Sequence, residues 1–213
     1  MENFSEYLLN ETNYLKKIEI VYYLHKKTNI FFDRTVICKT ELARKFIEEM
    51  KIDVDENLVI TACLLYACKK VTVATNFEQI KFYAKEGAEY LSQLGFDERF
   101  CRICEGANRY SGITPREPES DILELVDNLG GLLINRSDRV SYGMQQALEL
   151  LVNKNLRDVD NRYLEKFKEF IFLEEGVKLW AFKFLNYQVK QQKMKLLKQY
   201  KRQKKESQNS LTM

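Results

Sequence analysis

Apolar residues recur along this chain three and four positions apart rather than at alternate positions. This spacing has the period of an amphipathic α-helix, which completes a turn every 3.6 residues. Two prolines and eight glycines are few for 213 residues, which argues against a sandwich or barrel with many turns. The sequence therefore predicts an all-α protein of about eight helices. These helices are expected at residues 5–27, 36–50, 57–69, 76–94, 98–110, 119–135 and 142–152, with a last long helix beginning near Asp160.

The predicted helix at residues 57–69 is apolar almost all the way round. A helix that lacks a polar face is buried on every side, so we expect this one in the middle of the domain.

Capping residues mark some helix ends. Gly95 stands where a helix C-terminal glycine belongs, and Asp97 can cap the next helix. Thr75 and Glu78 have the spacing of a capping box.

Composition narrows the class of protein further. With 45% hydrophobic and 31% charged residues, the chain can build one sizeable core. Its net charge of +3 is too small to predict a polyanionic partner for the whole protein. The N-terminus lacks the pattern of a secretion signal, and no apolar run approaches the roughly 18 residues that span a bilayer. We therefore interpret the protein as cytoplasmic, with no membrane span.

The cysteines are odd in number and lie in apolar helical context, which favours reduced core thiols over a disulfide framework. They are Cys38, Cys63, Cys68, Cys101 and Cys104. An alternative is a zinc site, because Cys101 and Cys104 have the spacing of a half-site that Cys63 and Cys68 could complete. A zinc knuckle usually sets its pair in a turn, whereas this pair falls within a predicted helix. Core thiols are the expectation.

Asp127 occupies an unusual position on the predicted helix at residues 119–135. At about 100° per residue, the apolar residues gather on one broad face, while Asp121, Glu124 and Asn128 share a polar face. Asp127 falls on a second, small and apolar face beside two glycines. An ionised carboxylate there needs a metal, a cation or hydrogen-bond donors. The alternative is a half-exposed aspartate at the edge of the polar face.

Several short stretches, taken in order, resemble one protein family. They are Leu42-Ala43-Arg44-Lys45, Ala62-Cys63-Leu64-Leu65, Glu86-Gly87-Ala88-Glu89-Tyr90-Leu91 before Leu94-Gly95-Phe96, Ile103 to Ser111, and Ser120 to Asp127. Their order and spacing are similar to those of the HD-domain metal-dependent phosphohydrolases, from about Thr35 to Tyr142. The resemblance implies an HD-domain-like helical bundle.

The active site of that family holds a divalent metal with an early histidine, an adjacent His-Asp pair and a late aspartate. The resemblance places the early histidine at Thr35, or at Cys38 if the register slips. It places the His-Asp pair at Tyr66 and Ala67, and the late aspartate at Asp127. Only Asp127 keeps the family's residue type, so the resemblance implies vestigial metal-site positions.

No other histidine restores the set of ligands. Members of the family with a second metal have further histidines at positions that match Tyr83 and Ala107, and neither is histidine. The chain's only histidine, His25, precedes the resembling region at a helix end, where it usually interacts with the last carbonyls. Metal-assisted hydrolysis needs several ligands to hold the ion and lower the pKa of its water. We therefore expect no catalytic residues, no metal and no cofactor.

Two roles for Asp127 follow. In the first, its carboxylate pairs with the phenol of Tyr66 or with Lys70, and these side chains fill the space of the lost metal, so that the site is plugged. Lys70 matches a lysine that often follows the family's His-Asp pair. In the second, Lys70, Arg109 and Asp127 line a residual pocket that binds an anionic small molecule without cutting it. Filling by Tyr66 and Ala67 favours the plugged site.

The C-terminal third lies outside the resemblance. An apolar stripe predicts a long helical segment at residues 156–205, which packs on the body or on an unknown protein partner, with a disordered tail at 206–213. Before it come an N-terminal helix packed on the body at 1–34 and the HD-like domain at 35–155. Basic residues crowd the end of the long helix, at Lys190, Lys193, Lys195, Lys198, Lys201, Arg202, Lys204 and Lys205. This basic tail is where a nucleic acid could bind by counterion release.

The sequence supports two main classes of function. The first is a non-catalytic HD-like protein that acts as a scaffold, a regulator or a ligand-sensing module. The second is a nucleic-acid-associated protein that binds RNA or DNA through the basic tail, with an affinity that falls steeply with salt. An enzyme that uses Asp127 with Lys70 in different chemistry is a third candidate.

Overall fold

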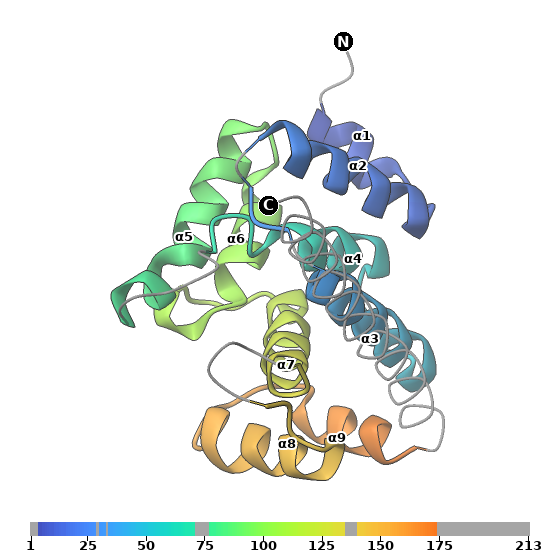
Figure 1. Cartoon of the computed structure of the whole chain (residues 1–213), viewed down its shortest axis with the longest axis vertical. Coiled ribbons are helices and arrows are strands. Elements are labelled where there is room, and N and C mark those ends of the chain that lie inside the picture. Colours follow the sequence, from blue (N-terminus) through green and yellow to red (C-terminus); the bar gives the residue numbers. More distant parts are fainter. Residues whose placement is uncertain (1–3, 29, 33, 71–76, 135–139, 174–213) are drawn as a thin grey trace, which may run out of the picture. The chain divides into compact units, whose positions relative to one another are not determined.

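The regular elements of the computed structural model are helices throughout its described residues (Figure 1). The predicted all-α class is therefore confirmed for this part of the chain. The described residues are 4–28, 30–32, 34–70, 77–134 and 140–173. In chain order the elements are α1 (Phe4–Asn10), α2 (Tyr14–Lys27), α3 (Arg34–Met50), α4 (Glu56–Leu65), α5 (Phe77–Gln93), α6 (Glu98–Gly106), the 3₁₀ helix η1 (Arg109–Ser111), α7 (Pro118–Leu132), α8 (Met144–Leu150), the π-helix η2 (Leu151–Asn155) and α9 (Leu164–Phe172).

The helix α4 is central to the described bundle, as its continuous apolar sequence predicts. It packs against α1, α2, α3, α6 and α7 (Figure 1). Asp55 caps its N-terminus by accepting a hydrogen bond from the backbone N–H of Leu58 at 3.0 Å. Every side chain from Val59 to Leu65 is buried. Each large aliphatic side chain buried in this way stabilises the fold by about 1.5–3 kcal/mol.

The N-terminal stretch predicted as one helix is two helices, because polar residues break it between α1 and α2. Asn13 caps α2 by accepting a hydrogen bond from the backbone N–H of Lys16 at 3.2 Å. Lys17, which is buried, donates from Nζ to the carbonyl of Leu8 at 2.9 Å and to the hydroxyl of Thr61. These bonds fasten the end of α1 to α2 and α4.

Other helix ends agree with the prediction in part. Gly95 takes the left-handed conformation with φ of 87°, and Asp97 caps α6, so both predicted capping residues are confirmed. The helix predicted at residues 98–110 ends early and gives way to η1, and the one predicted at 142–152 changes into the π-helix η2. The predicted capping box at Thr75 lies outside the described residues. None of the described helices is both long and apolar enough to cross a membrane.

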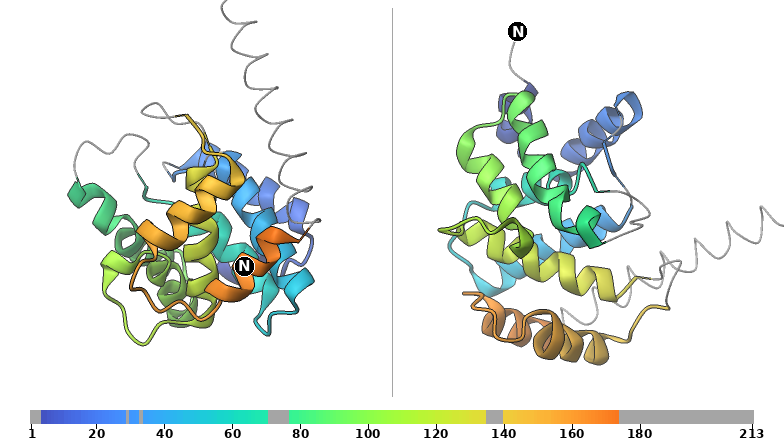
Figure 2. Two further views of the ribbon diagram at one scale, coloured as in Figure 1. Left: turned by 90° about the horizontal axis from the view of Figure 1, so that it is seen from below. Right: turned by 90° about the vertical axis from the view of Figure 1, so that its left-hand side faces the viewer.

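The helices α6 and α7 approach each other closely at Gly106. A Cβ at this position would lie 2.5 Å from Oγ of Ser120 on α7, so a larger residue would force the helices apart. The Ser120 hydroxyl also donates to the carbonyl of Ile103 on α6 at 3.0 Å. Figure 2 shows these helices from two further directions, with α5 packed beside α6. The close crossing fixes the start of α7, the helix that carries Asp127.

The polar face of α7 is buried, because arginines from three segments cover it. Asp121 and Glu124 are each 3% exposed. Arg109 donates two hydrogen bonds to the Glu124 carboxylate, at 2.6 and 2.9 Å. Arg116 donates to Asp121 at 2.9 Å, and Arg162 lies 3.2 Å from the same carboxylate. This network holds the loops that precede α7 and α9 against α7.

Candidate functional site

Asp127 on α7 is the centre of the candidate site. Its Oδ1 accepts a hydrogen bond from Nζ of Lys39 at 2.5 Å and another from the phenol of Tyr66. Nζ of Lys70 lies 3.9 Å from the same oxygen. The packing of α3, α4 and α7 against one another brings these groups to one carboxylate. The expected contacts of Asp127 with Tyr66 and Lys70 are present, and Lys39 is an additional partner.

Lys39 reaches Asp127 along the buried side of α3. Its side chain is 7% exposed and that of Asp127 is 18% exposed. Gly130 leaves the space for the lysine stem, since a Cβ there would lie 2.8 Å from Cγ of Lys39. An ion pair shielded from water in this way is costly to break, because removing one partner leaves the other charge uncompensated.

The charges around Asp127 fix the protonation states of the group. Burial opposes ionisation of the carboxyl, but the ammonium groups of Lys39 and Lys70 outweigh it and hold the pKa of Asp127 well below its usual 3.8. Burial raises the pKa of the Tyr66 and Tyr83 phenols well above the usual 10.0, and the charge of Asp127 raises them further. Both phenols therefore stay protonated, while Asp127 stays an ionised acceptor.

Lys70 is the more exposed of the two cations. Its side chain is 35% exposed, and its Nζ lies 5.1 Å from the ring centroid of Tyr83. Because this ammonium is partly hydrated and farther from Asp127 than that of Lys39, its attraction to the carboxylate is weaker. The site thus has one enclosed cation and one at the surface.

None of the other positions that the resemblance assigned to metal ligands carries a histidine or a carboxylate. Ala67 is buried next to Tyr66 in the turn after α4, and its methyl group cannot coordinate an ion. Thr35 and Cys38 are half-buried on α3, in the turn before Lys39. The two segments that would carry histidines in the family therefore carry a phenol, a methyl, a hydroxyl and a thiol.

Arg109 lies apart from the residual pocket in which the sequence placed it. Its guanidinium is bound to Glu124, one turn before Asp127 on α7, and donates to the carbonyl of Asp160 at 2.6 Å. The structure brings Lys70 and Asp127 together, but their close third member is Lys39.

The residues around Asp127 do not fit a divalent metal. The group offers one carboxylate with two ammonium groups and protonated phenols, and the ammonium charges would repel a second cation. Within the described ranges, no group of three or more His, Cys, Asp or Glu side chains is placed to hold a metal ion. The arrangement is that of a closed ion pair.

The four cysteines considered as a zinc alternative are free thiols. Cys63, Cys68 and Cys104 are buried, and Cys101 is half-buried. Burial raises the pKa of Cys68 to about 12 and that of Cys101 to about 11. No three of these thiols, or of the other His, Cys, Asp and Glu side chains in the described residues, are grouped to hold a metal ion, so their burial serves packing.

Lys39 is the member of the site that sequence reasoning missed, although two signals could have found it. Lys39 lies in the apolar phase of its helix, three residues after Val36 and four before Ala43, both of which are buried. A lysine in a buried stripe needs hydrogen-bond acceptors or an anionic partner, and Asp127 is an acid on an apolar face. Asp127 is therefore one candidate partner that the sequence offers for Lys39.

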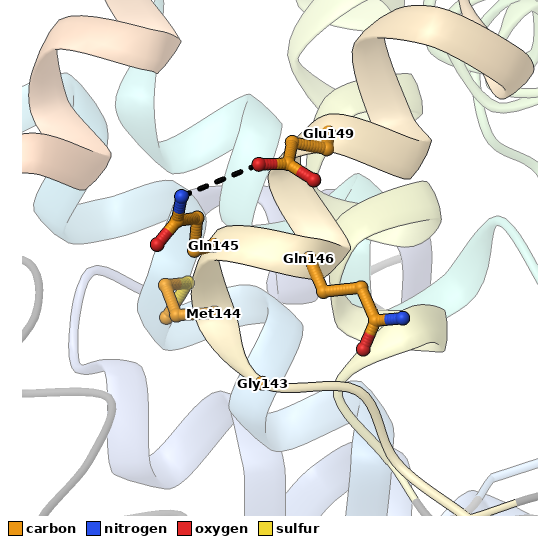
Figure 3. Close-up of a pocket in the computed structure, with 5 residues that line it drawn as sticks. All are labelled: Gly143, Met144, Gln145, Gln146 and Glu149. Carbon is orange, nitrogen blue, oxygen red and sulfur yellow. Dashed lines mark hydrogen bonds between the residues drawn. The ribbon is translucent and has the colours of Figure 1, made fainter.

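A surface hollow at the start of α8 has no lining residue in common with the Asp127 group. Its lining is Gly143, Met144, Gln145, Gln146 and Glu149 (Figure 3). Gln145 donates to Glu149 across it at 3.3 Å. These residues hold one carboxylate and no cation, so they do not form a set of catalytic groups.

Comparisons with known proteins do not assign the chain to a family. It matches no protein-family model, no curated protein and no solved structure. The basic tail that the sequence assigns to nucleic-acid binding lies outside the described residues. Function must therefore be argued from the sequence resemblance and from the geometry around Asp127.

Proposed function

We propose that this protein is a non-catalytic HD-like helical module that acts as a scaffold or regulator. The observation that supports this proposal is the ion pair between Lys39 and Asp127, whose atoms Nζ and Oδ1 lie 2.5 Å apart. A lysine ammonium here neutralises the one carboxylate that matches the metal site of the HD enzymes. The positive charge that a metal would bring is supplied by the chain itself.

The plugged arrangement favours a scaffold or regulator over a ligand sensor. Tyr66 is fully buried with its phenol on Asp127, and Lys39 is enclosed between α3 and α7. A phenol and an ammonium that already satisfy the carboxylate leave it with no need of an external partner. The function then lies on the outer surfaces of the helices.

Metal content and phosphohydrolase turnover of the purified full-length chain test this proposal. We expect substoichiometric metal after growth in medium supplemented with manganese and iron, and no turnover of nucleotides above that of Asp127→Asn. The matched control is Glu149→Gln, which removes an exposed carboxylate on α8. Stoichiometric metal together with turnover that Asp127→Asn abolishes and Glu149→Gln retains would overturn the proposal.

A further inference from the structure

The last turns of α2 expose aromatic and basic side chains together. Tyr22 is 48% exposed and Tyr23 is 64% exposed. Nζ of Lys26 lies 5.3 Å from the ring centroid of Tyr22, and Nζ of Lys27 lies 5.5 Å from that of Tyr23. Both lysines are exposed as well. Two consecutive pairs of ring and ammonium therefore face solvent at one end of the helix.

The segment after α2 brings further rings to this place. The ring centroid of Phe32 lies 6.0 Å from that of Tyr22. His25 completes the group, 6.2 Å from Tyr22 and 6.1 Å from Phe32. Nδ1 of His25 lies 2.7 Å from the carbonyl oxygen of Ile30, which holds the chain turned back against the helix. We call Tyr22, Tyr23, His25, Lys26, Lys27 and Phe32 the aromatic-basic patch.

The local charge of the aromatic-basic patch is positive. The sequence from residue 20 to residue 32 contains no Asp or Glu. The backbone N–H of Phe31 donates to the carbonyl of Cys68 at 2.6 Å, which brings the chain at Lys69 alongside the segment that follows α2. The Lys69 ammonium lies over the ring of Tyr90, 3.8 Å from its centroid. A lysine on this second segment thus also contacts an aromatic ring.

The helix dipole explains only part of this pattern. Lysines in the last turn of a helix offset the partial negative charge of its C-terminus. That effect gives no reason for two adjacent tyrosines to remain exposed beside them. Aromatic faces interleaved with cations are the combination that binds unpaired bases and their phosphates. A membrane surface is a poorer fit, because it requires a broad apolar face, which two tyrosines beside two lysines do not form.

We propose that the aromatic-basic patch binds single-stranded nucleic acid. Bases stack on the rings of Tyr22 and Tyr23, and Lys26 and Lys27 contact the adjacent phosphates. Tyr22 and Tyr23 point about 100° apart on the helix, so they take different bases. This inference depends neither on the lost metal site nor on the basic tail after Val189.

Fluorescence anisotropy of labelled oligouridylate and oligodeoxythymidylate, titrated with the full-length chain, tests the proposal. We expect Tyr22→Ala and Tyr23→Ala each to weaken binding by about tenfold, because each removes a stacking surface. Tyr22→Phe retains the ring and should bind as the unmodified chain does. Phe82→Ala is the matched control, since it removes a ring that is 49% exposed on α5 and lies outside the patch.

The salt dependence of binding in the same titration measures the contribution of the two lysines. Neutralising Lys26 and Lys27 together, as Lys26→Gln with Lys27→Gln, should reduce the slope of log affinity against log salt by about 1.4, or about 0.7 for each phosphate contact to a single strand. All substituted side chains are exposed, so circular dichroism should show unchanged helix content.

Three results would overturn the proposal. The first is an absence of binding to either oligonucleotide. The second is binding that Tyr22→Ala and Tyr23→Ala leave unchanged, which assigns it to another surface such as the basic tail. The third is binding to phosphatidylglycerol vesicles without binding to oligonucleotides, which identifies a membrane surface.

Discussion

Lys17 and Lys39 are both buried in this fold, and they are held in opposite ways. Lys17 is 0% exposed and donates to two neutral oxygens, the carbonyl of Leu8 and the hydroxyl of Thr61. Lys39 is also buried and lies against the ionised carboxylate of Asp127. Burial lowers the pKa of the Lys17 ammonium to about 8, because the charges of Glu11 and Asp55 offset only part of the loss of water around it.

The comparison shows two different roles for a buried lysine: Lys17 joins helices through hydrogen bonds, whereas Lys39 provides a charge that pairs with Asp127. Lys17 joins helices through hydrogen bonds that a neutral amine can also donate, so its charge is a cost to the fold. Lys39 and Asp127 stabilise each other's charge, since Lys39 alone would be enclosed without compensation and Asp127 alone would retain only the weaker Lys70. A fixed cation inside the candidate site is what distinguishes that site from a metal centre.

The largest expected effect is the contrast between Lys39→Met and Lys17→Met. Removing the Lys39 ammonium leaves Asp127 partly buried with a weaker partner, and should lower the free energy of unfolding by about 3–5 kcal/mol. Lys17→Met also loses hydrogen bonds, but it removes a buried charge, so its effect at pH 7 should stay within about 1 kcal/mol. Urea unfolding of both variants measures the two values, and equal losses would contradict the distinction.

Alkaline pH provides a second contrast between the two lysines. The folded-state pKa of Lys17 is about 8, below the ordinary 10.5, so between these values the unfolded chain binds a proton that the folded chain does not. The free energy of unfolding should therefore gain about 3 kcal/mol from Lys17 as the pH rises from 8 to 10.5. Other groups titrate in this range, so the measured quantity is the difference between the unmodified chain and Lys17→Met. A difference that does not change across the window would contradict the assignment.

Two adjacent glycines on α7 test whether the Lys39 side chain needs the space that Gly130 leaves for it. A Cβ at Gly130 would collide with the Lys39 stem, whereas a Cβ at Gly131 would meet open space. Gly130→Ala should lower the free energy of unfolding by about 1–3 kcal/mol. Gly131→Ala should raise it by as much as about 1 kcal/mol, because alanine favours the helix. Thermal unfolding of this pair gives the comparison, and a stabilising Gly130→Ala would show that the stem of Lys39 is free to move.

The smallest expected effect is that of Lys70→Gln. Its ammonium is partly hydrated and lies 3.9 Å from Asp127, so the pair should contribute less than about 1 kcal/mol. The same urea titration measures it beside Lys39→Met. A loss as large as that of Lys39→Met would show that the two cations share Asp127 equally.

Local patterns in the sequence were sufficient to predict most of the described helices. The apolar period and the caps at Gly95 and Asp97 are properties of neighbouring residues, and the structure agrees with them. The apolar period predicts one helix across Asn13, whereas the cap at Asn13 begins a new helix there. Short-range capping outweighed periodicity there.

The partners of the candidate site were harder to predict, because they are distant in the sequence. Lys39 and Asp127 are 88 residues apart, so their pairing depends on how α3 packs on α7. The arginines that bury Asp121 and Glu124 come from the short helix η1 and from loops, whose course one sequence does not define. Individual charges on apolar faces were visible, but the tertiary packing that pairs them was not.

Thermal unfolding of the full-length chain with and without divalent metal tests most directly whether Lys39 takes the place of a metal at Asp127. A ligand that binds only the folded state raises the unfolding temperature, so a metal held by Asp127 would be detected in this way. We predict the same unfolding temperature in EDTA, in excess Mg²⁺ and in excess Mn²⁺. A rise of several degrees with either metal, absent in Asp127→Asn, would contradict it.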